Sequence, residues 1–210
     1  MIKLYYSPGA CSLAPHIVLE ELGIAYEPVL VSLKDGDHKK ADFLKINPKA
    51  RVPALNVDGK VLTENVAILT YLGGGYADRG LWPKETWKQA EALSLMAWLA
   101  SSVQVAFAGN VRPERYASDA VAKENVKATS REIVLGYYAD IDKLLTGKTF
   151  AMGGQYTVCD PYLLVFYRWG YRLGLDMKTQ FPHWTKHAMR VASRPTVKRV
   201  FEDEGIQLES

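Results

Sequence analysis

Short hydrophobic runs alternate with amphipathic segments over the first 75 residues of the chain. Their spacing predicts strands at residues 2–6, 27–32, 53–57 and 60–63, and helices at residues 12–22, 39–46 and 64–72. Gly23 supplies a C-cap for the first helix, and Pro28 assigns the second strand to a sheet edge. Asp58-Gly59 forms a two-residue hairpin turn. This order of elements predicts an α/β domain over residues 1–75.

The pattern changes after the glycine run at residues 73–75. Residues 76–83 are expected to form a linker, and every later periodic segment is helical. The expected helices cover residues 84–108, 114–145, 157–172 and 184–192, with a short one after Pro195. We therefore expect an all-α domain over residues 84–210.

One helical segment, residues 92–111, carries no formal charge and is long enough to cross a bilayer. Serine, glutamine and asparagine side chains interrupt it, and it continues a polar helical run. We therefore expect a buried helix and no membrane partner.

Composition narrows the class of protein. The chain has 210 residues, of which 48% are hydrophobic and 23% are charged, so it is neither disordered nor a disulfide-dense scaffold. Its net charge of +3 is too small to indicate a nucleic-acid partner. The N-terminal residues lack the apolar core of a signal peptide, so we expect a cytoplasmic protein.

Cys11 is the first candidate for chemistry, because it lies where the first helix is expected to begin. A helix N-terminus favours the thiolate, which is the reactive form, whereas the alternative is an inert buried cysteine. Ala14 occupies the second cysteine position of a CxxC motif, so a dithiol centre is not expected. The hydroxyls of Ser12 and Tyr6 are nearby in sequence, although Ser12 also suits a helix cap and Tyr6 suits packing.

Two further segments suit ligand binding. Val52-Pro53 precedes a strand, and a cis bond there would offer backbone groups to a ligand. Glu64-Asn65 opens a helix, where a carboxylate and unpaired helix N–H groups suit the two charged ends of an amino acid. The alternative for Glu64-Asn65 is a simple capping role.

Other polar motifs have structural interpretations. Thr157 and Asp160 have the spacing of a capping box, which leaves Cys159 in the core. His183 and His187 share a helix face, but no nearby cysteine or acid completes a ligand set, so no metal site is expected.

A family resemblance is carried by three N-terminal segments: YYSPGACSLAPHIVLEELG, INPKARVPAL and VLTENVAILTYL. They resemble the thioredoxin-like domain of the glutathione transferases, and specifically the cysteine-containing beta class of bacterial enzymes. In the second half, YTVCDPYLL resembles the family's capping box and WLASSVQVAF its central substrate-side helix. The resemblance implies an α/β thioredoxin-like N-terminal domain followed by an all-α C-terminal helical bundle.

The resemblance implies a role for each matching residue. Cys11 matches the class cysteine that lies beside the glutathione sulfur, and Ser12 and Tyr6 match hydroxyls that assist the thiolate. Val52 matches the residue whose backbone pairs with the cysteinyl part of glutathione, and Pro53 matches the family's cis-proline.

The two ends of glutathione have implied partners as well. Glu64 and Asn65 match the pair that holds the γ-glutamyl end, although a small residue is more usual in place of Asn65. Lys34 falls near a basic residue that meets the glycyl carboxylate, and Arg51 is a substitute for it.

The implied electrophile pocket comprises Ala10, Gln104, Phe107, Tyr116 and Trp169. Gln104 replaces a class histidine that is followed by lysine, and glutamine forms hydrogen bonds but cannot act as an acid or base near neutral pH. We therefore expect a more apolar pocket than is typical of the class.

The resemblance implies a detoxifying glutathione transferase that joins glutathione, as a co-substrate, to hydrophobic electrophiles without a metal. The family is usually homodimeric. Two alternatives stay open: a glutathione-dependent disulfide reductase or dehalogenase that acts through Cys11, and a non-catalytic glutathione-binding or ligand-binding protein.

Overall fold

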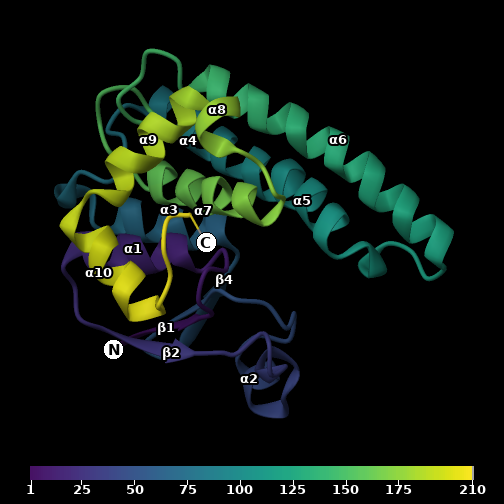
Figure 1. Cartoon of the computed structure of the whole chain (residues 1–210). Coiled ribbons are helices and arrows are strands. Elements are labelled where there is room, and N and C mark those ends of the chain that lie inside the picture. Colours follow the sequence, from purple (N-terminus) through teal and green to yellow (C-terminus); the bar gives the residue numbers. More distant parts are fainter. Residues whose placement is uncertain (210) are drawn as a thin grey trace.

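A four-stranded mixed sheet forms the base of the N-terminal half in the computed structural model, which describes residues 1–209 (Figure 1). The strands are β1 (Ile2–Tyr6), β2 (Tyr26–Leu30), β3 (Ala54–Val57) and β4 (Lys60–Thr63), in the order β2-β1-β3-β4. β1 runs parallel to β2 and antiparallel to β3. Pro28 lies in the edge strand β2, where its missing N–H breaks no ladder, as predicted.

Helices cover both faces of this sheet. They are α1 (Leu13–Leu22), η1 (Asp37–Lys39), α2 (Ala41–Ile46) and α3 (Asn65–Gly75). Leu4 of β1 belongs to the large core beneath α1 and α3, whereas Tyr5 points to the opposite face and packs against Phe43 of α2 at 5.9 Å. The alternation along β1 therefore decides which cluster each side chain joins.

The remainder of the chain is helical, which confirms the expected fold class. Its elements are η2 (Ala77–Arg79), α4 (Thr86–Trp98), η3 (Leu99–Val103), α5 (Gln104–Val111), η4 (Pro113–Arg115), α6 (Ala120–Leu144), α7 (Cys159–Arg172), α8 (Met177–Gln180), α9 (Pro182–Ala192) and α10 (Pro195–Glu204). The helix expected from residue 114 begins only after Asp119, whose carboxylate accepts the N–H of Ala122 at 2.9 Å. The short helix α8 was not predicted.

The glycine run at residues 73–75 forms the end of α3, so the helix expected at residues 64–72 ends three residues later. Gly73 lies in α3, and a Cβ there would be 3.0 Å from the Val158 side chain and 3.2 Å from that of Trp82. Glycine therefore permits α3 to approach the helical half closely. The expected linker is also packed, since Leu81, Trp82 and Pro83 are buried.

The segment Thr86–Val111 is long and apolar enough by length and composition to cross a membrane, with a mean hydropathy of 1.5. In the protein, 39% of its most apolar window is buried, since α4 packs against α3 and α7 and α5 packs along α6. The buried helix expected at residues 92–111 is thus a bundle helix with one face left open.

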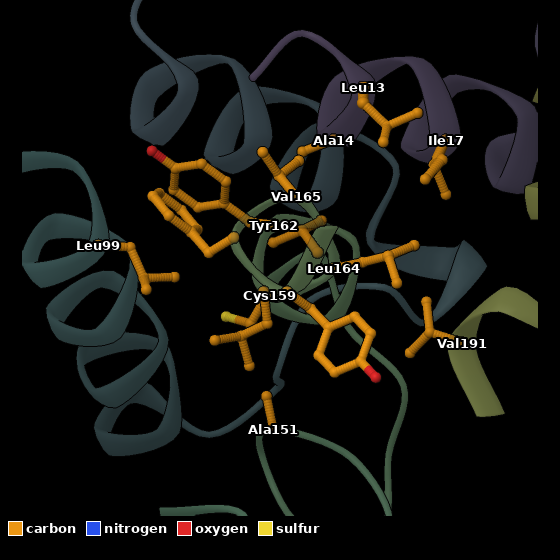
Figure 2. Close-up of a cluster of buried hydrophobic side chains, with 14 of the residues drawn as sticks. Leu13, Ala14, Ile17, Leu99, Ala151, Cys159, Tyr162, Leu164, Val165 and Val191 are labelled. Carbon is orange, nitrogen blue, oxygen red and sulfur yellow. The ribbon is translucent and has the colours of Figure 1, made fainter. Parts of the chain in front are cut away.

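Helix α7 is the centre of the bundle. All residues from Cys159 to Gly170 are buried, and Figure 2 shows side chains of α7 surrounded by Leu13 and Ile17 of α1 and by Leu99 and Val191. A helix that is enclosed on every side needs its polar groups paired.

The start of α7 meets that need through Asp160, which is fully buried. Its carboxylate accepts the backbone N–H groups of Ala151 and Thr157, both at 2.7 Å, and lies 2.8 Å from His187 Nε2. One half of the predicted capping box is therefore confirmed, the bond from the Thr157 N–H to Asp160, whereas the Thr157 hydroxyl accepts the N–H of Cys159 at 3.4 Å. Asp160 also contacts His187, which was considered above only as a metal ligand. Cys159 is a free, buried thiol whose pKa is raised to about 12 by burial, as expected of a core residue.

Replacing Asp160 with alanine is expected to destabilise the protein strongly. The change leaves the buried N–H groups of Ala151 and Thr157 and the ring of His187 without their hydrogen-bond partner, which typically costs about 3–5 kcal/mol. Asp119→Ala removes an exposed cap of the same chemistry and should cost only about 1 kcal/mol. Urea unfolding of both variants measures the difference, and equal losses would contradict the central role of Asp160.

Candidate active site

Two adjoining cavities lie where the loops after β1 and before β3 face the helical half. The larger has a volume of about 970 Å³ and the smaller about 420 Å³. The residues that line both are Cys11, Arg51, Val52, Gln104, Ala108 and Arg115. A ligand in one cavity would therefore meet a ligand in the other beside the Cys11 sulfur.

Cys11 lies in the loop just before α1, and its thiol donates to the carbonyl oxygen of Val52 at 3.3 Å. Burial raises the pKa of this thiol to about 11, against smaller opposing effects of hydrogen bonds from Asn65 and Gln104. The expectation of an easily ionised thiol is thus wrong for the free protein, because desolvation outweighs the helix terminus. Cys11 is a neutral hydrogen-bond donor here.

Ser12 does not reach either cavity. It is fully buried, its hydroxyl donates to Ser7 O at 3.2 Å, and its Oγ accepts the Ser7 N–H at 3.1 Å. Both bonds hold the loop before the helix, so the hydroxyl is not free to assist a thiolate, and it makes no capping bond to α1. Ser7, which the sequence analysis did not single out, lines the larger cavity.

Tyr6 also lies outside both cavities. Its ring packs 5.0 Å from that of His16 on α1, and burial together with Glu204 and Asp203 raises its pKa. The pleat of β1 directs Tyr6 toward the core that contains α1. The structure therefore holds Tyr6 and Ser12 away from both cavities, and their catalytic roles stay predictions from the resemblance.

The smaller cavity contains the expected ligand-binding segments. The Val52-Pro53 bond is cis, and both residues line the cavity. Glu64 precedes α3 with a φ of 74°, a conformation that is strained for a residue with a side chain. Its carboxylate lies at the cavity wall and pairs with Lys49 Nζ at 2.7 Å.

Asn65 offers an unused acceptor in the same cavity. Its Nδ2 donates to the carbonyl oxygen of Cys11 at 3.0 Å, which ties α3 to the Cys11 loop. Its Oδ1 is buried and has no hydrogen-bond partner within residues 1–209. A ligand donor is the natural partner for such an atom.

Gln104 stands at the junction of the two cavities. It follows the π-helical turn η3, a rare irregularity that occurs frequently at functional sites. Its Oε1 lies 3.5 Å from the hydroxyl of Tyr162, a residue of α7 that also lines the smaller cavity. No local sequence pattern points to Tyr162 as a site residue, because only packing brings α7 to this place.

The larger cavity has an aromatic wall. Phe107 of α5 and Trp169 of α7 stack with their ring centroids 4.5 Å apart, and Ala10 lies beside them. The Trp169 Nε1–H donates to Gly9 O at 3.0 Å, which fixes the loop that carries Cys11. Tyr116 lines the smaller cavity and not the larger one, so the structure does not bring it together with Phe107 and Trp169. It follows η4 and faces the α3 side.

The same cavity is strongly cationic. Its acidic lining residue is Glu114, whereas the basic ones are Lys34, Lys39, Arg51, Arg112, Arg115 and Arg172. Lys34 and Arg51 both line this cavity, and the more apolar pocket inferred from Gln104 did not anticipate the charge around its aromatic wall. The run VRPER at residues 111–115 was a usable signal for two of these arginines. Arg172 reaches the cavity only through the packing of α7.

No group of three histidine, cysteine or acidic side chains with metal-binding geometry occurs in the part of the chain that the structure describes. His183 and His187 do not share one environment. His187 contacts Asp160 inside the core, whereas His183 is partly exposed.

Comparison with known proteins assigns both halves of the chain. Residues 1–74 match the family description "Glutathione S-transferase, N-terminal domain" and residues 99–195 match "Glutathione S-transferase, C-terminal domain". The chain is 32% identical over 213 residues to glutathione S-transferase GstA of Escherichia coli O157:H7, covering 98% of this chain and 100% of that protein.

Two solved structures are similar over almost their full length. A glutathione transferase homologue from Sulfitobacter with bound glutathione has a TM-score of 0.92 at 32% identity and covers 99% of each chain. A bacterial beta-class glutathione S-transferase of Sphingomonas chungbukensis has a TM-score of 0.84 at 36% identity, covering 98% of this chain and 100% of that one.

The raised pKa of Cys11 predicts a slow thiol. With a pKa of about 11, roughly one molecule in a thousand carries the thiolate at pH 8, so alkylation by iodoacetamide should be slow and should rise with pH up to about 11. Peptide mass spectrometry measures the rate for Cys11 beside Cys159 and free glutathione. A Cys11 rate that levels off below pH 9 would contradict the burial argument.

Proposed function

The chain belongs to the glutathione S-transferase family, and we propose that its two cavities hold glutathione and an electrophile side by side for transfer of the glutathione thiolate. The activity is that of a glutathione transferase, in line with the N-terminal and C-terminal domains of that family. The observation that carries the proposal is the junction of the cavities at Cys11, with amino-acid-binding groups on one side and aromatic rings on the other.

Glutathione fits an extended position across the N-terminal domain. We propose that residues 1–75 bind it, that residues 76–83 connect the domains, and that residues 84–210 supply the electrophile pocket. Glu64 and Asn65 would bind the γ-glutamyl end, and the unpartnered Oδ1 of Asn65 would accept a hydrogen bond from it. The backbone of Val52 would pair with the cysteinyl part.

The glycyl carboxylate would then extend into the larger cavity. Lys34 and Arg51 line that cavity and supply its positive partners. This direction leaves the glutathione sulfur at the junction, next to Cys11 and Gln104.

The thiolate needs donors at that point, because a thiolate forms readily only where charge or hydrogen bonds stabilise it. In the proposed mechanism the neutral thiol of Cys11 turns from Val52 O toward the sulfur, and the side-chain amide of Gln104 donates from the other side. The positive field of the surrounding arginines lowers the free energy of the anion further. Binding beside the electrophile then supplies proximity.

A route in which Cys11 itself attacks a disulfide or a halide is less well supported. Such an attack requires the thiolate, and the pKa of about 11 keeps that form scarce. A non-catalytic binding role has no observation that favours it.

The proposal also covers the class within the family, the cellular compartment and the oligomeric state. We infer membership of the beta class from the similarity to the Sphingomonas chungbukensis structure, and a cytoplasmic, detoxifying role from the kinship with GstA. Two free cysteines suit a reducing compartment. A homodimer would cover the open face of α4, where Leu93 is exposed.

Substitution of Cys11 tests whether its thiol acts as a hydrogen-bond donor or as a nucleophile. With 1-chloro-2,4-dinitrobenzene as electrophile, Cys11→Ala should lower kcat/KM about tenfold, the typical loss of one hydrogen bond to a charged group. Cys11→Ser keeps a donor and should recover most of that loss, while Cys159→Ala in the core serves as control. Loss of all turnover in both Cys11 variants would instead assign Cys11 the role of nucleophile.

Substitution of Glu64 tests the glutathione site. Glu64→Gln keeps the shape but removes the charge that would face the ammonium group, so the Kd for glutathione should rise about tenfold. Isothermal titration calorimetry measures this beside Glu124→Gln, an exposed glutamate of α6. An unchanged Kd in Glu64→Gln would remove Glu64 from the site.

A further inference from the structure

We propose that the electrophile of this enzyme is an anion, a flat aromatic molecule that carries a carboxylate, and that arginines of the helical domain recognise this group. The inference rests on the proposed function, because it names the substrate class of the larger cavity.

The first support is an uncompensated positive charge. The larger cavity is lined by six lysine and arginine side chains and one glutamate. None of these six cations takes part in an ion pair within residues 1–209, although twelve ion pairs occur elsewhere in that range. Cations elsewhere, such as Lys60, Lys123 and Lys127, also lie outside these ion pairs, but the six are gathered around one cavity with a single carboxylate among them. An anion bound there would meet several positive partners at once.

The cations exceed what glutathione needs. Its glycyl carboxylate is one negative charge, and Lys34 and Arg51 of the N-terminal half suffice for it. Arg112, just before η4, and Arg172, at the end of α7, line only the larger cavity, whereas Arg115 lines both cavities. A second anion is therefore the expected partner of Arg112 and Arg172.

These arginines also repel one another. Burial lowers the pKa of Arg115 and Arg172, and in both cases the charge of Arg112 adds to the effect. The nearby His38 has its pKa lowered by burial and by Lys39, Arg51, Arg112 and Arg115. An anion bound among them relieves this repulsion, whereas a neutral electrophile leaves it in place.

The aromatic wall of the cavity indicates that the anion carries an aromatic ring. Phe107 and Trp169 stack nearly parallel, with an interplanar angle of 21°, and the guanidinium carbon of Arg172 lies 5.8 Å from the Phe107 centroid. A ring that packs on this surface would carry its carboxylate to Arg172 and Arg112. The planar guanidinium matches a carboxylate by two parallel hydrogen bonds, which a neutral group cannot replace.

The reaction itself is unaltered by this recognition. The glutathione thiolate attacks the ring carbon that bears the halide, a C–S bond forms with the sulfur's electron pair, and the halide leaves with the electrons of the C–halogen bond. The thiol proton passes to water. Carboxylate and arginines stay unchanged and serve only to place the ring.

The test compares two electrophiles of nearly the same shape, one charged and one neutral: 4-chloro-3,5-dinitrobenzoate and 4-chloro-3,5-dinitrobenzamide. Each kcat/KM is divided by the uncatalysed rate constant with glutathione, which removes the difference in intrinsic reactivity. We expect the carboxylate to be preferred by about tenfold or more, the effect of one well-placed charge-assisted contact, and the preference to fall as salt rises.

Arginine variants locate the recognition. Arg112→Gln and Arg172→Gln should each reduce the carboxylate preference about threefold or more, and the double variant should bring it near one. Arg79→Gln is the matched control, since Arg79 is exposed and lies outside both cavities. The preference is a ratio within one variant, so a loss of folded protein does not affect it.

The outcomes separate the two claims. Equal normalised efficiency for benzoate and benzamide overturns the inference and leaves the transferase function standing. Variants that raise the KM for glutathione without altering the preference also overturn it, because the arginines would then serve glutathione. No turnover of either electrophile removes the proposed function, and the inference with it.

Discussion

The enclosure of α7 on every side is the constraint on which the rest of the structure depends. A helix buried from Cys159 to Gly170 can hold few polar groups, and each must be bonded. Asp160 satisfies the start of the helix by tying it to Ala151, Thr157 and His187. Once fixed, the same helix presents Tyr162 to the smaller cavity and Trp169 to the larger one. The packing of the core therefore sets the geometry of the site.

The site itself is organised by charge more than by hydroxyl groups. Ser12 and Tyr6, the hydroxyls nearest to Cys11 in sequence, are committed to the loop and the core. Around the sulfur position stand instead a neutral thiol, an amide and several arginines. Unpaired cations destabilise a folded protein through mutual repulsion, so their retention in one cavity points to a ligand that offsets it. A donor thiol and a positive field favour the same chemistry, which is the holding of an anion.

The predicted elements that survive in the structure depend on local rules. The hairpin at Asp58-Gly59, the C-cap at Gly23 and the capping bond between Thr157 and Asp160 arise from backbone preferences of a few consecutive residues, and all three are present. The helix predicted to end at residue 72 extends to Gly75, and Gly73 has a non-local role, because it permits the close contact between α3 and the side chains of Trp82 and Val158.

The sequence by itself determined the order of strands and helices, the division into an α/β half and a helical half, and several of the residues that line the two cavities, because spacing and motif are properties of the chain alone. Only the tertiary structure decided which of these residues reach a ligand. The pleat of β1 turned Tyr6 toward the core, burial made Cys11 a donor in place of an anion, and the packing of α7 brought Arg172 to Arg112 and Arg115. Side-chain direction, desolvation and the meeting of distant charges are properties of three-dimensional packing, and no spacing along the chain encodes them.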